Sequence, residues 1–215
     1  MFILDHLNPF PLADRLTANN NSHIWNKYLQ LNDCEWIKIT APSGTGKTTL
    51  MHILYALRSD YTGNTIFNQH NLRTLAGNDL STIRQYNLSV IFQDLKLFPL
   101  LTAKENIELK RVLQTPYCSS ERVYEMAQTL GVTHILEQPT SICSYGEQQR
   151  IAIIRALVQP FNWLIMDEPF SHLDQANKKI AATLIAEECI KRNAGLIITD
   201  LDDDDLFDYS RKLIL

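Results

Sequence analysis

The sequence predicts an α/β fold built on a parallel sheet. Apolar, strand-like runs at residues 35–40, 163–166 and 196–199 are separated by helical patterns, and a helical stretch at 175–192 joins the last two. Repeated strand-helix-strand order is typical of parallel sheets with helices packed on their faces. The run at 163–166 is apolar throughout, as expected of a strand that is covered on both sides.

Composition limits the class of protein. At 215 residues the chain is long enough for one sizeable core, and a hydrophobic content of 45% fits a globular protein. The formal net charge is −4, so the sequence lacks the basic footprint of a nucleic-acid partner and we expect none. Four cysteines without C-x-x-C spacing indicate reduced thiols in a cytosolic setting. No window approaches the roughly 18 apolar residues that span a bilayer.

Short strands and helices are expected in the N-terminal part and in the middle of the chain. Residues 1–40 are expected to form short strands joined by a polar loop at 17–22. A further strand is expected at 88–92, followed by helices at 102–112 and 119–130, the second capped by Ser119 or Ser120. The helices suggest a helical subdomain inserted between two strands of the sheet.

A glycine-rich run between the strand at 35–40 and a following helix has the composition of a phosphate-binding P-loop. In such a loop backbone N–H groups surround the α- and β-phosphates, Lys47 reaches the β- and γ-oxygens, and the Thr48 hydroxyl ligates Mg²⁺. The helix is expected to present Leu50, Ile53, Leu54 and Leu57 on one face. The predicted cradle comprises Ala41, Pro42, Ser43, Gly44, Thr45, Gly46, Lys47, Thr48 and Thr49.

Acidic residues follow two of the predicted strands. Asp167, at the end of the apolar run, is the natural second Mg²⁺ contact, and Glu168 is placed to orient or deprotonate an attacking water. On these residues alone the alternative remains that two acids before a proline end a strand in solvent. The four successive acids at 202–205 are expected to begin a helix that runs toward Phe207.

The segment at 142–150, Ile-Cys-Ser-Tyr-Gly-Glu-Gln-Gln-Arg, resembles the signature motif L-S-G-G-Q/E-x-Q-R of the ATP-binding cassette (ABC) ATPases. Gln93 resembles the Q-loop of that family, and residues 171–174 resemble its D-loop. With the P-loop and Asp167-Glu168, five motifs stand in the family's order. Residues 98–106 look like the L-T-A-x-E-N region of the lipoprotein-release, macrolide-export and cell-division groups.

The resemblance implies an architecture and partners. The fold would be a P-loop NTPase core at 1–92 and 160–215, with an N-terminal antiparallel β subdomain and an inserted helical subdomain at about 95–158. Two such domains, as a homodimer or a heterodimer, would pair head to tail around ATP and Mg²⁺. An integral membrane permease subunit would hold this cytoplasmic chain at the inner face of the membrane.

The resemblance also implies roles for individual residues. Glu168 and Gln93 would be catalytic, with Asp200 standing where the family has a switch histidine, and Thr48, Gln93 and Asp167 would hold Mg²⁺. Asp174 would belong to the D-loop. The signature residues that act on the nucleotide of the opposite subunit would be Ser144, Tyr145, Gly146 and Glu147.

Three positions depart from the family pattern. Ala41 replaces the first glycine of the P-loop, Tyr145 replaces the first glycine of the signature pair, and Asp200 replaces the switch histidine. A phenol at 145 would clash with the opposing phosphate or donate a hydrogen bond, of which we favour the clash, and a carboxylate at 200 would repel a γ-phosphate. The departures predict slow or altered hydrolysis.

Three questions stay open in the sequence. Phe10, Trp25 and Tyr28 all compete as the aromatic residue that stacks on the base. An ATP-dependent regulatory module of a membrane complex, with little turnover, is an alternative to a transport ATPase. A P-loop small-molecule kinase is a further alternative, in which the segment at 142–150 would have no use.

Overall fold

The computed structural model describes residues 1–13 and 21–215, so most of the polar loop expected at 17–22 lies outside the described residues. The order of its helices and strands confirms an α/β fold, with helices between β6 and β7. In chain order the elements are β1 Phe2–Pro9, η1 Phe10–Leu12, β2 Tyr28–Leu31, β3 Trp36–Thr40, α2 Lys47–Leu54, β4 Tyr61–Phe67, β5 His70–Asn71, α3 Gly77–Tyr86, β6 Leu88–Ile91, α4 Ala103–Arg111, α5 Ser120–Thr129, η2 Thr133–Ile135, η3 Thr140–Ile142, α6 Tyr145–Leu157, β7 Trp163–Asp167, α7 Gln175–Arg192, β8 Gly195–Asp200 and β9 Arg211–Ile214.

The strands form two sheets. An antiparallel sheet has the order β2-β1-β4-β5, and a parallel sheet has the order β6-β7-β8-β3-β9. The carboxyl ends of parallel strands meet at one edge of a sheet. The loop after β3, Asp167 and Glu168 at the end of β7, and Asp200 at the end of β8 therefore come together at that edge.

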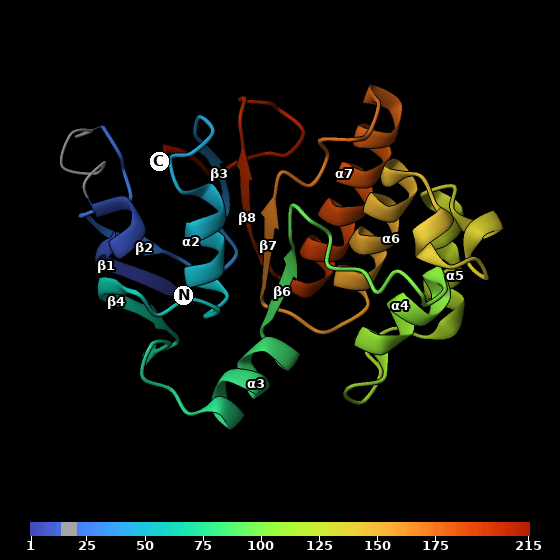
Figure 1. Cartoon of the computed structure of the whole chain (residues 1–215), viewed down its shortest axis with the longest axis horizontal. Coiled ribbons are helices and arrows are strands. Elements are labelled where there is room, and N and C mark those ends of the chain that lie inside the picture. Colours follow the sequence, from blue (N-terminus) through green and yellow to red (C-terminus); the bar gives the residue numbers. More distant parts are fainter. Residues whose placement is uncertain (14–20) are drawn as a thin grey trace.

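The sheets and helices form successive layers (Figure 1). From left to right the figure shows the antiparallel sheet, α2, the parallel sheet, then α7 and α6, with α4 and α5 outermost. Strand alternation divides the parallel sheet between two buried clusters, because successive side chains point to opposite faces. Ile37 and Ile39 of β3 pack with α2, whereas Leu196 and Ile198 of β8 pack with α6 and α7. None of the described helices is long and apolar enough to cross a membrane.

Capping residues set the helix ends. Thr102 and Ser144 each begin a helix with a reciprocal capping box, and Ser119 and Asp174 accept a backbone N–H from the first turns of α5 and α7. Satisfying the free N–H groups of a first turn is a local effect, so these starts were predictable. At the other end of α7 the left-handed cap is Asn193, with φ of 53°, because Gly195 already belongs to β8.

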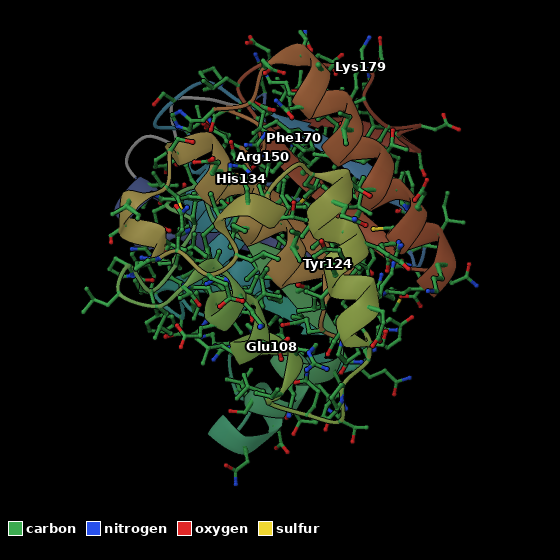
Figure 2. All side chains as sticks on the ribbon, turned by 90° about the vertical axis from the view of Figure 1, so that its right-hand side faces the viewer. Glu108, Tyr124, His134, Arg150, Phe170 and Lys179 are labelled. Atoms are coloured by element: carbon green, nitrogen blue, oxygen red, sulfur yellow. The ribbon has the colours of Figure 1, made fainter. Side chains whose placement is uncertain are left out.

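A hydrogen bond and an ion pair tie the helices to each other. Figure 2 looks onto the helical side of the molecule, with Tyr124 on α5, Arg150 on α6 and Lys179 on α7. Arg150 donates to the side-chain oxygen of Asn177 on α7 at 3.1 Å, and Arg122 on α5 bonds the buried Glu188 of α7 at 2.7 Å. These contacts fix the layer that carries the start of α6.

Two expectations were wrong. Leu57 does not lie on the helix after the P-loop: α2 ends at Leu54, Ala56 takes a left-handed φ of 57°, and Leu57 is 51% exposed. The acidic run at 202–205 does not begin a helix. Asp204 pairs with Lys38, and Asp203 and Asp205 pair with Lys212, so these ionic contacts prevail over the local preference of acids for a helix start.

Candidate nucleotide-binding site

The P-loop has the geometry expected of a phosphate cradle. It joins β3 to the start of α2, and Gly44 and Gly46 adopt left-handed φ values of 80° and 105°, which glycine reaches without strain. Ala41 does not have positive φ; it is buried, and its N–H donates to the Asp200 carbonyl at 3.1 Å. The methyl group that replaces the first P-loop glycine is therefore accommodated in the core.

Leu12 and Trp25, from the N-terminal part of the chain, pack against the P-loop at Gly46 and Thr45. A β-carbon on Gly46 would lie 2.5 Å from Leu12 Cδ1 and 3.2 Å from the Trp25 ring. The Trp25 indole N–H donates to the Thr45 carbonyl at 3.3 Å, and the ring is buried. Of the three competing aromatics, Trp25 is covered by the loop whereas Phe10 and Tyr28 are exposed. Leu12, which sequence reasoning missed, is recognisable only from this packing.

Lys47 is held in place before any phosphate arrives. Its side chain is 7% exposed, and Nζ lies 2.9 Å from the Ala41 carbonyl, 3.3 Å from the Pro42 carbonyl and 3.3 Å from Glu168 Oε1. Gln93 Nε2 donates to the other oxygen of Glu168 at 3.2 Å. A phosphate would meet an ammonium that is neutralised by one carboxylate and otherwise bonded to neutral carbonyls.

Glu168 has a constrained backbone. Its φ is 47°, a left-handed value that costs about 1–3 kcal/mol in a residue other than glycine. The Glu168 N–H donates to the Thr199 carbonyl at 2.9 Å, and the Gln149 amide lies 3.4 Å from the Glu168 carbonyl. Strain of this kind persists where surrounding contacts hold the backbone in place. Here the strained conformation places the Glu168 carboxylate within bonding distance of Lys47 and Gln93.

A hydroxyl and a carboxylate form the start of a cation site. Thr48 Oγ1 donates to Asp167 Oδ2 at 2.8 Å, and the buried Thr199 hydroxyl donates to Asp167 Oδ1 at 2.6 Å. Hard oxygen donors of this type suit Mg²⁺, which is usually bound through one or two protein ligands together with phosphate oxygens and water. The donor set therefore fits Mg²⁺ bound together with a phosphate. Thr199 was not predicted as a site residue. The signal in the sequence was a polar side chain near the end of an otherwise apolar strand.

Most of the P-loop residues line one hollow together with Gln93 and Glu168, whereas Asp167 and Thr199 do not border it. A cavity of about 240 Å³ is bounded by Leu12 and Glu168, by Gln93, and by P-loop residues. Of the predicted site residues, it brings together Ser43, Gly44, Gly46, Lys47, Thr48, Thr49, Gln93 and Glu168. Larger hollows elsewhere on the described surface lack this set of groups, so we assign the site by its chemistry.

The predicted signature residues form a separate group at the start of α6. Ser144 caps the helix and both its N–H and its hydroxyl bond Glu147, whose pKa is lowered by these hydrogen bonds. Tyr145 donates to the Gln93 carbonyl at 3.2 Å, and its ring lies 4.1 Å from that of His172. A β-carbon on Gly146 would lie 3.1 Å from the His172 carbonyl. Within one chain, Tyr145 thus joins the segment at 142–150 to Gln93 and to His172.

Asp174 caps α7, and Gln149 connects α6 to the segment that follows β7. Asp174 caps α7 through the Asn177 N–H at 2.8 Å, a hydrogen bond that lowers the pKa of its carboxyl group. The Gln149 side chain accepts the His172 N–H at 3.1 Å while its amide faces the Glu168 carbonyl. Gln149 is buried, and its position as a polar residue on the inner face of a helix was the signal that sequence reasoning passed over.

Asp200 is set apart from the cavity around Lys47. Its Oδ2 accepts from Lys38 Nζ at 3.3 Å and its Oδ1 accepts the Leu201 N–H at 2.8 Å. The carboxylate lines a different hollow, of about 410 Å³, together with the acids at 202–205 and two lysines of α7. The structure therefore separates Asp200 from the other predicted catalytic residues.

Fold and site together define a P-loop nucleotide-binding domain with a signature helix beside it. The ABC transporter family model matches residues 26–171. Over 166 residues the chain is 34% identical to the lipoprotein-releasing system ATP-binding protein LolD of Buchnera aphidicola subsp. Schizaphis graminum, with 76% of this chain and 72% of that protein covered. It is 32% identical over 176 residues to the ABC transporter ATP-binding protein YvcR of Bacillus subtilis, with coverages of 81% and 68%.

Solved structures agree with the sequence matches. The fold resembles that of MJ0796, a bacterial ABC transporter cassette solved as a dimer, with a TM-score of 0.79, 25% identity, and 94% of this chain and 88% of that chain covered. The chain belongs to the ABC transporter family, as one of its ATP-binding ATPase subunits. The family resemblance in the sequence is thereby confirmed, and the small-molecule kinase alternative is rejected.

Proposed function

We propose that this chain binds ATP with Mg²⁺ at residues 41–49, pairs with a second ABC ATPase subunit around the nucleotide, and hydrolyses ATP to drive an integral membrane partner. The observation that carries the proposal is the meeting of five side chains at one edge of the sheet: Thr48 bonds Asp167 at 2.8 Å, and Lys47 and Gln93 bond Glu168 at 3.3 and 3.2 Å. Phosphoryl transfer depends mostly on positioning and electrostatic stabilisation, which such a set supplies.

Each residue has a distinct task in this proposal. Lys47 exchanges its bond with Glu168 for the β- and γ-phosphate oxygens, which frees Glu168 to accept a proton from the attacking water. Thr48, Asp167 and Gln93 would hold Mg²⁺, whose positive charge would offset the negative charge that develops on the γ-phosphate. Bonds from Thr199 keep Asp167 oriented.

The second half of the site would come from another chain. Ser144, Tyr145, Gly146 and Glu147 stand at the start of α6 and do not line the cavity around Lys47, although the Tyr145 hydroxyl bonds the Gln93 carbonyl. We propose that they face the nucleotide of the opposite subunit, with Asp174 beside them. The free N–H groups and the dipole of a helix start favour an anion there. We further propose that residues at about 95–158 act as a helical subdomain and that a membrane permease subunit holds the chain at the inner face of the membrane.

A second candidate function is an ATP-dependent regulatory module with little turnover. Two observations favour it: Tyr145 places a phenol where the family has glycine, and the Asp200 carboxylate is bonded to Lys38 rather than available near the cavity. Both departures concern steps after nucleotide binding. Binding is therefore common to the two functions, and turnover distinguishes them.

The test of the proposed function is a comparison of ATP binding and steady-state ATPase activity. MgATP should bind the purified chain, and turnover should be measured with and without the membrane partner. Brisk turnover that is lost in Glu168→Gln supports the transport ATPase. Tight binding with negligible turnover under both conditions supports the regulatory module, and the absence of ATP binding contradicts both.

A further inference from the structure

The buried lysine in β3 is a feature that the proposed function does not use. Lys38 lies in the middle of the strand that leads into the P-loop, and its side chain is 0% exposed. Alternation along the strand places it on the face covered by α6 and α7, since Ile37 and Ile39 face α2. A buried ammonium is costly unless carboxylates pair with it, so its partners identify its role.

Lys38 has two carboxylate partners. Nζ lies 3.3 Å from Asp200 Oδ2, at the end of the neighbouring strand β8, and it also bonds Asp204 Oδ2. Asp204 is further bonded by the Tyr209 hydroxyl at 2.8 Å. Burial alone would raise the pKa of Asp204, but hydrogen bonds from Lys38, the Leu206 N–H and Tyr209 outweigh it and hold that pKa below its usual value.

Asp200 is close to the phosphate cradle by its backbone but not by its carboxylate. The residue before it, Thr199, bonds the Asp167 carboxylate, and the Asp200 carbonyl accepts the N–H of Ala41, where the P-loop begins. Both carboxylate oxygens are already bonded, one to Lys38 and one to the Leu201 N–H. The carboxylate lines the hollow beside α7 and not the one around Lys47.

We propose that Lys38 is a positioning residue that keeps the Asp200 carboxylate away from the bound phosphates. An unpaired carboxylate at this edge of the sheet would repel a γ-phosphate, and the ion pair both neutralises it and directs it to the opposite side of the strand. Asp204 is a second carboxylate partner of the lysine, and it lines the hollow beside α7 and not the cavity around Lys47. The inference rests on the proposed function, because it assumes that a triphosphate binds near Lys47.

The test is a set of charge-removing variants examined by isothermal titration with MgATP. Lys38→Met keeps the length and the apolar stem of the side chain and releases Asp200, so ATP should bind on the order of tenfold more weakly at low salt. The loss should shrink as salt is added, because screening weakens the repulsion. Adding Asp200→Asn to Lys38→Met should restore the affinity, whereas Asp204→Asn alone, the matched control, should leave it unchanged.

Thermal melting checks that each variant is folded. If Lys38→Met does not fold, the pair Lys38→Met/Asp204→Asn leaves Asp200 as the sole released carboxylate and carries the same expectation, with rescue by a third change, Asp200→Asn. The inference is overturned if a folded variant without Lys38 binds ATP as the wild type does, if Asp200→Asn gives no rescue, or if neither background folds. Failure of the wild type to bind ATP contradicts the proposed function instead.

Discussion

Lys38, in the middle of β3, and Lys47, at the start of the helix that follows it, are both buried lysines, yet of the two only Lys47 lines a described cavity. Lys47 is bonded to two carbonyl groups and to one carboxylate, that of Glu168, which it shares with Gln93. Lys38 is bonded to two carboxylates, and its ammonium also lies 5.9 Å from the Tyr209 ring. The difference teaches that the number of carboxylates around a buried lysine decides whether its charge remains available to an anion.

Replacing the available lysine should have the largest effect. Lys47→Ala removes the side chain whose charge-assisted hydrogen bonds would hold the phosphates, each worth about 1.5–3 kcal/mol, so ATP affinity should fall on the order of 100-fold. Equilibrium binding of MgATP measures it. Lys104→Ala is the control, because Lys104 is an exposed lysine that pairs with Glu137 on the surface. Equal affinities in the wild type and Lys47→Ala would show that the cradle assignment is wrong.

Removing the carboxylate that competes for Lys47 should separate binding from turnover. In Glu168→Gln the general base is lost, and ATPase turnover should fall about 100-fold or more. Binding should be retained or tightened, because Lys47 no longer has a carboxylate partner. Steady-state turnover and titration with MgATP give the two values, with the exposed Glu137→Gln as a control. If turnover is retained in Glu168→Gln, the general base is a residue other than Glu168.

Disturbing the support of the P-loop should have an intermediate effect. Gly46→Ala places a methyl group 2.5 Å from Leu12 Cδ1 at a φ of 105°, which should destabilise the fold by about 1–3 kcal/mol and weaken ATP binding. Gly77→Ala is a matched control, since nothing lies within 4 Å of its added carbon, and it should be neutral or stabilising by up to about 1 kcal/mol. Urea unfolding gives the free energy of unfolding of each variant. Similar free energies for Gly46→Ala and Gly77→Ala would mean that the P-loop is not tightly packed at Gly46.

The smallest effect should come from lowering the pH, which weakens the pairing of Asp204 with Lys38 and so reduces the stability of the fold. Since the pKa of Asp204 is lowered from 3.8, its pairing stabilises the folded chain at pH values above the unfolded pKa and is lost as the pH falls through the folded pKa. Asp204→Asn should therefore be less stable than the wild type at pH 7, and the difference should shrink below about pH 4. Melting curves between pH 3 and 7 measure it, with the exposed Asp202→Asn as control. A gap that is constant with pH would contradict the ionic origin.

The parts of the structure that were predictable depend on short stretches of sequence. The P-loop, the capping residues Ser144 and Asp174, and the strand that ends in Asp167 act through neighbours a few residues away, so their patterns are visible in the chain. The pairing of Lys38 with Asp200 joins residues 162 positions apart and left no local signal. The acidic run at 202–205 was misjudged for the same reason.

Local rules also failed where a helix end was set by backbone conformation. The apolar spacing continued to Leu57, but the left-handed Ala56 ended the helical stretch before it. The position of Trp25 could not be predicted because three aromatic residues had equal claims in sequence, and only the packing of the N-terminal part against the P-loop distinguishes them.

Trp25 gives the chain a built-in optical reporter. Its indole touches the P-loop at Thr45 and Gly46, whereas Trp163 is enclosed in the core and Trp36 packs edge-on against Phe207 and bonds the Ala194 carbonyl. A ligand that reshapes the loop would change the surroundings of this one fluorophore. Its emission could then follow nucleotide arrival in real time, with no added dye, while the other two tryptophans supply a constant background.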